Sequence, residues 1–334
     1  MRKIETLVVC LGRQDHAEFL PEPILDQCRA LASCTHIREI ETSDVVSFAR
    51  ELIGLDPEVL IGGWSTPALP LRLPPRLRYL CFLTGSIRRI VRREHLEHGL
   101  IVSNWGRSIS RTVAECALML MLAALRRVGY WVPAMHRDRA WKNRQTETAS
   151  LFGRRVGLHG FGNVARALVR LLEPFHTTIR VWAPESDPEV YEANGVARAH
   201  SLSNLFEESD IVVELAPLLP ETQGIVTEGL LRRIRPGGVF VNVARGQLVD
   251  EDALTRVAQE GRILIALDVF ATEPLPGDSP LRGLPNVILL PHLAGPTTDR
   301  RRDAGVFALR NLRAYAAGEP LEAVIHPTNF DLVA

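Results

Sequence analysis

Three side chains that could do chemistry on a small acid follow apolar, strand-like runs in the second half of the chain. The runs span residues 239–243, 263–267 and 287–290, and the side chains that follow them are Arg245, Glu273 and His292. Because the carboxyl ends of strands in an open α/β sheet face the ligand crevice, we expect the three side chains to meet there. Arg245 could hold a carboxylate with two hydrogen bonds, and Glu273 could fix the tautomer of His292 for general acid catalysis.

This set of side chains fits the reduction of a 2-keto acid. The arginine would orient the acid, the protonated histidine would protonate the forming alkoxide, and a nicotinamide would supply hydride. Each residue alone is weak support, since Arg245 could instead pair with Asp250 or Glu251 at the surface. Single histidines and glutamates are also common in loops, so the interpretation depends on the three together.

A glycine turn that could hold a dinucleotide begins at Gly160. A short apolar run at residues 156–158 predicts a buried strand, Gly160 and Gly162 follow it, and Ala165 lies in an apolar pattern of helical period. The first glycine allows a sharp turn, the second lets the backbone approach a pyrophosphate, and the small third residue lets helix and strand pack closely. Amides at the helix start would then hold the phosphate charge. An ordinary tight turn between a strand and a helix would show the same pattern.

The composition is typical of a globular protein with more than one core. The 334 residues are 46% apolar and 23% charged, which predicts two domains. The formal net charge is zero, which argues against a general binder of nucleic acid or of anionic membranes.

The cysteines and the apolar runs indicate where the protein works. The five cysteines are odd in number and show no C-x-x-C spacing, which favours a reducing compartment and gives no disulfide or metal framework. We read no signal peptide, and the longest apolar stretch, residues 117–125, is too short to cross a bilayer. We therefore predict a cytoplasmic protein with no metal site, no nucleic-acid partner and no membrane partner.

The first hundred residues alternate between strand-like and helix-like segments, which predicts a parallel sheet covered by helices. The expected strands span residues 7–11, 37–40, 59–61, 77–83 and 100–102. The proline-rich stretch 66–75 is predicted to be an exposed, irregular connection. The basic run 88–93 is interpreted as a solvated helix face, with a site for a phosphorylated substrate as the alternative.

The rest of the chain predicts a second α/β series after one long helix. The helix is expected at residues 112–128, and its apolar surface is wide enough for burial on several sides. Six strands then alternate with helices, which suits a doubly wound nucleotide-binding sheet. These strands are expected at residues 156–158, 178–182, 211–215, 239–243, 263–267 and 287–290. A last helix at about residues 299–317 is expected to return to the first domain.

At this point the chain resembles the D-isomer-specific 2-hydroxyacid dehydrogenase family over nearly its whole length. The stretches that carry the resemblance are residues 157–165, 218–224, 241–250, 267–276 and 291–295. The resemblance implies an α/β protein with two Rossmann-like, doubly wound parallel-sheet domains and the active site in the cleft between them. It implies a discontinuous substrate-binding domain, residues 1–103 plus 296–334, and a dinucleotide-binding domain, residues 104–295.

The resemblance also implies roles for particular residues. Arg245 would bind carboxylate and carbonyl, His292 would be the acid/base and Glu273 would support it. The loop of Thr84, Gly85 and Ser86 would bind the substrate carboxylate through backbone N–H groups. The cofactor would contact Gly160, Phe161, Gly162, Asn163, Val164, Ala183, Pro184, Ala216, Pro217, Thr222, Val243, Ala244, Arg245, Asp268 and His292. The protein would be a homodimer built through the nucleotide domain.

One departure from the family concerns the choice of cofactor. After the strand at residues 178–182 stands Ala183, where the family usually has an aspartate for the adenosine ribose. Glu185 or Asp187 could replace that carboxylate, and no adjacent arginine is placed for a 2′-phosphate. We therefore expect NAD as the cofactor, with NADP not excluded.

The expected activity is hydride transfer between NAD(H) and a D-2-hydroxy acid or its 2-keto acid. Two alternatives stay open from the sequence. One is an NAD(H)-sensing binding protein like the dehydrogenase-like transcriptional corepressors. The other is a related dehydrogenase of formate or phosphite.

Overall fold

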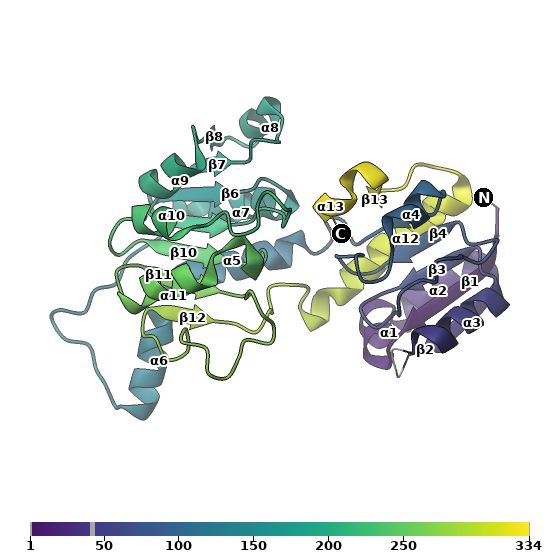
Figure 1. Ribbon diagram of the computed structural model, residues 1–334, viewed down its shortest axis with the longest axis horizontal. Coiled ribbons are helices and arrows are strands. Elements are labelled where there is room, and N and C mark those ends of the chain that lie inside the picture. Colours follow the sequence, from purple (N-terminus) through teal and green to yellow (C-terminus); the bar gives the residue numbers. More distant parts are fainter. Residues whose placement is uncertain (1, 41–43, 334) are drawn as a thin grey trace. The chain divides into compact units, whose positions relative to one another are not determined.

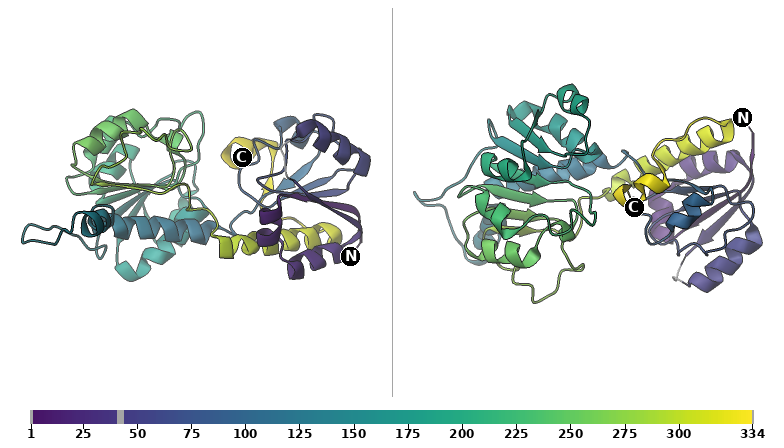
Figure 2. Two further views of the ribbon diagram at one scale, coloured as in Figure 1. Left: turned by 90° about the horizontal axis from the view of Figure 1, so that it is seen from below. Right: turned by 45° about the horizontal axis from the view of Figure 1, so that its top comes forward.

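The computed structural model describes residues 2–40 and 44–333 (Figure 1). The chain folds into two compact units, one of residues 1–109 with 296–334 and one of residues 110–295. Each unit is an α/β layer structure with its own sheet, as Figures 1 and 2 show. In the described part of the chain, no helix is both long enough and apolar enough to cross a bilayer.

The first unit contains a six-stranded sheet in the order β13-β5-β4-β3-β1-β2. All neighbours are parallel except β13, which pairs antiparallel with β5. The strands are β1 (Ile4–Leu11), β2 (Ala32–Glu39), β3 (Val59–Gly62), β4 (Tyr79–Phe82), β5 (Ile101–Ser103) and β13 (Val324–Ile325). The five predicted strands are confirmed, whereas the two-residue edge strand β13 was not predicted.

Helices cover both faces of this sheet (Figure 2). On one face Phe48 and Leu52 of α3 pack with Val8, Leu60 and Leu80 of the strands. On the other face α12 packs against α1, α2 and β4. The helices of the unit are α1 (Arg13–Phe19), α2 (Glu22–Ala30), α3 (Val45–Leu55), α4 (Arg93–Glu97), α12 (Arg301–Ala317) and α13 (Phe330–Val333).

Two predictions for this unit need correction. The stretch 66–75 is irregular as predicted, but it is not simply exposed, because Thr66 is buried and Leu69 packs into the core that contains Leu60 and Leu80. The basic run 88–93 is a turn and not a helix face, since α4 begins only at Arg93. Two of its four arginines bond to the C-terminal segment: Arg88 donates to the carbonyl of Asp331, and Arg93 pairs with the Asp331 carboxylate.

The second unit contains a seven-stranded, fully parallel sheet in the order β12-β11-β10-β9-β6-β7-β8. Chain order reverses between β6 and β9, so the topological switch point lies at their carboxyl ends. The strands are β6 (Arg155–His159), β7 (Thr178–Trp182), β8 (Ala197–Arg198), β9 (Ile211–Glu214), β10 (Val239–Asn242), β11 (Leu264–Leu267) and β12 (Val287–Leu289). The six predicted strands are confirmed, and β8 is an unpredicted two-residue edge.

Two layers of helices enclose this sheet. α5 and α7 pack together on one face, and α9, α10 and α11 cover the other with a core that includes Phe206, Leu231 and Val257. The helices are α5 (Ser110–Leu125), α6 (Val128–Arg137), α7 (Asn163–Leu172), α8 (Pro188–Ala193), α9 (Leu202–Glu208), α10 (Glu228–Arg233) and α11 (Glu251–Gln259). The long helix predicted at 112–128 ends at Leu125, because the backbone of Arg127 turns to φ +53° before α6 begins.

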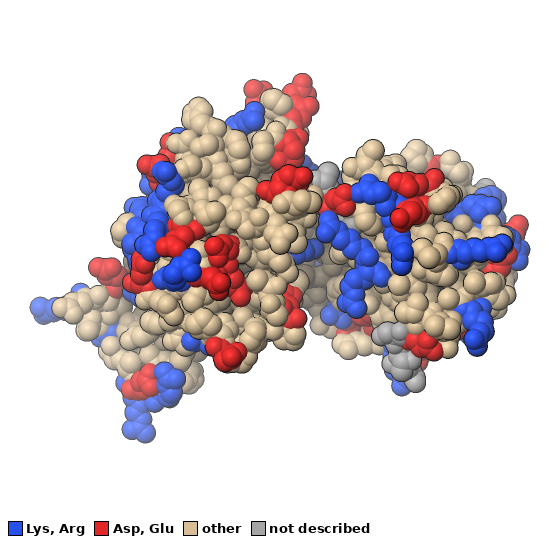
Figure 3. Space-filling view, in the orientation of Figure 1, with Lys and Arg blue, Asp and Glu red and all other residues tan. Residues whose placement is uncertain are grey.

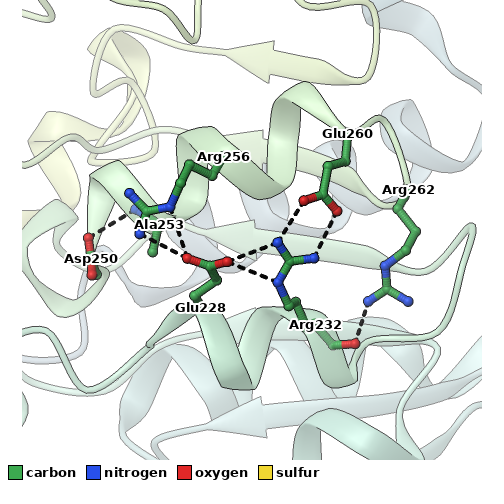
Figure 4. A network of polar contacts seen from close by, with 7 residues as sticks. All are labelled: Glu228, Arg232, Asp250, Ala253, Arg256, Glu260 and Arg262. Atoms are coloured by element: carbon green, nitrogen blue, oxygen red, sulfur yellow. Dashed lines mark hydrogen bonds and ion pairs between the residues drawn. The ribbon is translucent and has the colours of Figure 1, made fainter.

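An ion-pair network ties α10 to α11 on the outer surface of this layer (Figure 4). Arg232 contacts Glu228 at 2.9 Å and Glu260 at 2.6 Å, and Arg256 contacts Glu228 at 2.9 Å. Asp250 caps α11 by accepting a hydrogen bond from the amide of Ala253 at 3.0 Å. The network therefore links α10 to α11 and has a structural role.

Candidate active site

The glycine turn joins β6 to α7 as the sequence predicts. Gly160 has φ +91°, and a Cβ there would lie 2.7 Å from the backbone of Ala216, so no larger residue fits. Gly162 has no heavy atom within 4 Å of the position where a Cβ would stand. Ala165 is fully buried in the first turn of α7. At Gly160 the turn packs closely on the backbone of Ala216, and at Gly162 it leaves open space for a ligand. Both features are required of a turn that binds a pyrophosphate.

The start of α7 leaves backbone donors for an anion. Gly162 is the N-cap and supplies no side-chain cap, and the amides of Asn163 and Val164 have no carbonyl four residues earlier within the helix. The Asn163 side chain accepts from Arg166 at 2.8 Å and so does not cap the helix either. Free amides and the positive end of the helix dipole fit the pyrophosphate of a dinucleotide.

The end of β7, where an adenosine ribose would lie, carries no carboxylate on the strand itself. Ala183 is buried, and its carbonyl accepts a hydrogen bond from the hydroxyl of Tyr191 at 2.5 Å. Tyr191 also stacks on Phe161, with ring centroids 5.5 Å apart. Asp187 is exposed but is used as the N-cap of α8, where it accepts from the amide of Glu189, and Glu185 is a further exposed acid between β7 and α8.

The loop after β9 forms a mostly apolar wall beside the glycine turn. Ala216 is buried next to Gly160, and Pro217 is partly buried. Val243, which follows the neighbouring strand β10, is buried as well. Thr222 shapes this loop from within, because its hydroxyl donates to the carbonyl of Pro217 at 2.7 Å and accepts from the amide of Leu219 at 2.7 Å. The hydroxyl that was predicted to contact the cofactor is therefore already used to hold the loop.

A buried histidine–glutamate pair, which the sequence reasoning missed, lies directly at the switch point. His159 ends β6 and Glu214 ends β9, and their side chains meet at 2.6 Å between Nδ1 and Oε2. His159 is 4% exposed and Glu214 is fully buried. The other carboxylate oxygen accepts from the amide of Ala216 at 2.9 Å. The pair thus joins the last residue before Gly160 to the wall against which Gly160 packs.

Burial and the neighbouring carboxylate act on His159 in opposite directions. Burial lowers the pKa of the imidazole, but the charge and hydrogen bond of Glu214 outweigh it, with a smaller contribution from Glu185, so the pKa is raised above 6.5. The sequence does contain a sign of this pair, because His159 and Glu214 are polar residues that each end an apolar run.

Arg245 sits on a turn that Asn242 holds. The Asn242 side chain donates to the carbonyl of Arg245 at 3.0 Å and accepts from the amide of Ala244 at 3.0 Å. A Cβ at Gly246 would lie 1.9 Å from the backbone of Phe270, so the turn packs directly on the loop after β11. The guanidinium is exposed at the carboxyl end of β10, and its Nη1 donates to the carbonyl of Ala244 at 2.7 Å.

Glu273 and His292 meet as predicted. Nδ1 of His292 and Oε2 of Glu273 are 2.7 Å apart, and the other oxygen of Glu273 accepts from the amide of Phe270 at 3.1 Å. The side chain of His292 is 47% exposed and that of Glu273 is 35% exposed. His292 also adopts φ +55°, a conformation that costs a non-glycine residue energy and that clusters at functional sites. Because Glu273 occupies Nδ1, Nε2 is the ring nitrogen left for a substrate.

Asp268 builds the loop that carries His292. Its two carboxylate oxygens accept the amides of Leu293 at 2.6 Å and Ala294 at 2.9 Å, and its carbonyl accepts the amide of His292 at 2.9 Å. Burial raises the pKa of Asp268, and the two amides partly oppose that shift. These bonds make Asp268 a positioning residue for His292 as well as the predicted cofactor contact.

Cys116 of α5 lies in the same neighbourhood. Burial, together with the negative charges of Asp268 and Glu115, raises the pKa of this thiol to about 12. A raised pKa disfavours the thiolate, which is the nucleophilic form of cysteine.

The predicted substrate loop belongs to the first unit. Thr84 is fully buried, Gly85 is partly buried and Ser86 is exposed, directly after β4. The carbonyl of Gly85 accepts the side chain of Asn104 at 3.1 Å. Within residues 2–40 and 44–333, no hydrogen bond uses the amides of Gly85 or Ser86. They are available as donors.

The structure thus brings Arg245, Glu273 and His292 to the carboxyl ends of the adjacent strands β10, β11 and β12. It places the glycine turn and the Ala216 wall at the ends of β6 and β9 in the same sheet. A cation for a carboxylate, an imidazole held by a carboxylate and a phosphate cradle are the parts that hydride transfer to a 2-keto acid needs.

Residues 118–294 match the family model described as D-isomer specific 2-hydroxyacid dehydrogenase, NAD binding domain. The chain is 34% identical over 238 residues to glyoxylate/hydroxypyruvate reductase B of Pectobacterium atrosepticum, a match that covers 69% of this chain and 73% of that protein. It is 32% identical over 234 residues to D-3-phosphoglycerate dehydrogenase of Methanocaldococcus jannaschii, covering 70% of this chain but only 44% of that protein.

A crystal structure of a glyoxylate reductase from Paecilomyes thermophila has the same fold. Its TM-score is 0.81 at 23% sequence identity, and the match covers 96% of this chain and 98% of that one.

Proposed function

The chain belongs to the D-isomer-specific 2-hydroxyacid dehydrogenase family, and we propose that it transfers hydride between a nicotinamide dinucleotide and C2 of a 2-keto acid or D-2-hydroxy acid through Arg245, Glu273 and His292. The observation that carries the proposal is the 2.7 Å contact of His292 with Glu273 beside the Arg245 turn. The match to the NAD-binding family model supports NAD(P) as the cofactor.

Each side chain has a distinct task in the proposed reaction. The guanidinium of Arg245 holds the carboxylate and the carbonyl oxygen, which orients C2 and stabilises the negative charge that develops on that oxygen. A dihydronicotinamide bound at the glycine turn would supply the hydride. His292 donates the proton from Nε2 to the alkoxide oxygen, and Glu273 at Nδ1 stabilises the imidazolium and fixes its orientation. In the oxidative direction His292 takes the proton back.

We propose NAD(H) as the preferred form of the cofactor. Glu185 is the exposed acid left at the end of β7, and Asp187, Glu189 and Glu192 are exposed on or next to α8. Figure 3 shows acidic side chains gathered over this helix. Carboxylates there would accept hydrogen bonds from ribose hydroxyls and would repel a 2′-phosphate.

We also propose a homodimer that works in the cytoplasm. Five large apolar side chains on α5 and α6, two helices that pack against each other, are between 39% and 53% exposed. Exposed apolar surface of this kind occurs at protein–protein interfaces. They are Met119, Val128, Tyr130, Val132 and Met135. Light scattering after gel filtration tests the dimer: we expect twice the chain mass, and a monomer for the Val132→Glu variant.

The test of the proposed reaction is NADH oxidation over glyoxylate, hydroxypyruvate, pyruvate and phenylpyruvate, repeated with NADPH. We expect at least one 2-keto acid to be reduced, and NADH to be used better than NADPH. Binding of NADH without turnover of any acid would contradict the proposed enzymatic activity and would favour a nucleotide-sensing protein. Turnover of formate or phosphite alone would contradict the substrate class.

A further inference from the structure

The loop after β9 leaves the sheet directly beside the glycine turn. The amide of Leu215 donates to the carbonyl of His159 at 2.8 Å, and the next amide, that of Ala216, lies beyond the last paired residues of β6 and β9. Ala216 is buried, and a buried amide without an acceptor is costly. Pro217, which follows, has no N–H group. The path of the loop out of β9 therefore depends on the acceptor that the Ala216 amide finds.

Glu214 supplies that acceptor from inside the sheet. Its Oε1 accepts the amide of Ala216 at 2.9 Å, while its Oε2 lies 2.6 Å from Nδ1 of His159. The side chain of Glu214 is fully buried, so these two partners fix its position. The imidazole thus holds the carboxylate, and the carboxylate holds the backbone of Ala216.

The position of Ala216 matters for a ligand because Gly160 packs on it. A Cβ at Gly160 would lie 2.7 Å from both N and Cα of Ala216, so turn and loop touch through their backbones. On its other side, the amide of Gly160 donates to the carbonyl of Trp182 at 2.8 Å, at the end of β7. An open α/β sheet binds its ligand in the crevice at the topological switch point. A shift of Ala216 would therefore disturb the turn at which we place the pyrophosphate.

Stability alone does not account for a polar pair at this point. Replacement of a buried ion pair by apolar residues of similar volume is often neutral or even stabilising. Apolar side chains at 159 and 214, however, could not accept the amide of Ala216. The acceptor oxygen is thus what the His159–Glu214 pair provides and an apolar pair would not.

We propose that His159 and Glu214 are positioning residues for the dinucleotide: through the amide of Ala216 they hold the loop after β9 against Gly160, and they thereby set the affinity for NADH. The inference rests on the proposed cofactor site at the glycine turn. Proton transfer is assigned to His292, so the contribution of the buried pair belongs to cofactor binding.

The test measures Kd for NADH by fluorescence titration, together with KM for NADH and kcat, in the wild type and two variants. His159→Leu/Glu214→Leu removes the acceptor but leaves apolar side chains at both buried positions. We expect its Kd and KM for NADH to rise about tenfold, the effect of losing one hydrogen bond to a charged group, with a much smaller change in kcat. Glu214→Gln keeps an oxygen for the Ala216 amide and should bind NADH nearly as tightly as the wild type.

Asp210→Ala is the matched control. Asp210 pairs with Arg155 at 2.7 Å and accepts its amide at 3.0 Å, so it joins the same two strands at their amino ends, opposite to the glycine turn. This variant should lower the urea midpoint and leave Kd for NADH unchanged.

Three results would overturn the positioning role. They are an unchanged Kd in His159→Leu/Glu214→Leu, an equal rise of Kd in Asp210→Ala, and a Glu214→Gln variant that binds NADH as weakly as the double variant. Absence of NADH binding by the folded wild type would instead refute the proposed cofactor site itself.

Discussion

The second unit contains the same chemical pair twice, in opposite surroundings. His159 and Glu214 meet at 2.6 Å with side chains 4% and 0% exposed, whereas His292 and Glu273 meet at 2.7 Å with side chains 47% and 35% exposed. Both pairs lie at the carboxyl ends of strands in one sheet. The geometry of the contact is therefore nearly identical, and only the environment differs.

That difference fits a structural role for the first pair and the proposed catalytic role for the second. A buried carboxylate needs partners, and Glu214 has two, the His159 ring and the Ala216 amide. These bonds hold Ala216, against which Gly160 packs, in a fixed position. His292 instead has a side chain that is 47% exposed, and it sits on a strained backbone that Asp268 holds, which suits proton exchange with a substrate. We infer that the first pair positions the cofactor site and that the second carries out the chemistry.

The largest expected effect is on stability, from Glu214→Ala. Removal of one partner leaves a buried imidazole unpaired and should lower the free energy of unfolding by about 3–5 kcal/mol. Urea denaturation followed by circular dichroism measures this. The double variant His159→Leu/Glu214→Leu is the control and should recover most of the loss, because an apolar replacement of a buried pair is often neutral. A single variant as stable as the wild type would show that the pair does not hold the wall.

The corresponding change at the exposed pair, Glu273→Ala, should act on rate and hardly on stability. An exposed ion pair contributes about 0–1 kcal/mol, so the urea midpoint should stay close to that of the wild type. The kcat for 2-keto acid reduction should fall at least about tenfold, because the imidazole loses the carboxylate that orients it. A Glu273→Ala variant that is destabilised as strongly as Glu214→Ala and has a normal kcat would contradict the different roles assigned to the two pairs.

A smaller effect is the pH dependence of the buried pair. The pKa of His159 is raised above 6.5 in the folded protein, so its contribution to stability is complete below about pH 6.5 and is lost as the pH rises through the folded pKa. The unfolding free energy of the wild type minus that of His159→Leu/Glu214→Leu should therefore decrease from pH 6 upward. A difference that increases with pH would mean that His159 is neutral in the fold.

Much of this architecture follows from the sequence, and the exceptions have physical reasons. Alternating strands and helices, the glycine turn and the residues after β10, β11 and β12 were predictable because local pattern sets them. The His159–Glu214 contact joins residues 55 apart and depends on which strands are neighbours, which periodicity does not reveal. The strands β8 and β13 span two residues each, too short for any pattern.

Other differences arise from tertiary contacts. The prolines of the stretch 66–75 exclude regular structure, but Leu69 is nevertheless buried because it packs against Leu60 and Leu80 of the sheet. Asp268 was expected at the cofactor, and only the fold shows that both its carboxylate oxygens accept amides of the His292 loop. The side chains that we propose to react were thus predictable, whereas most of the bonds that hold them were not.

The most direct test of the central claim is kcat of His292→Ala at saturating NADH and 2-keto acid. We predict a fall of about a hundredfold or more, the scale of a lost general acid, with an unchanged urea midpoint. His200→Ala, at another exposed histidine of the same unit, is the control and should keep the wild-type rate. Near-normal turnover by a folded His292→Ala variant would contradict the assignment of proton transfer to the exposed pair.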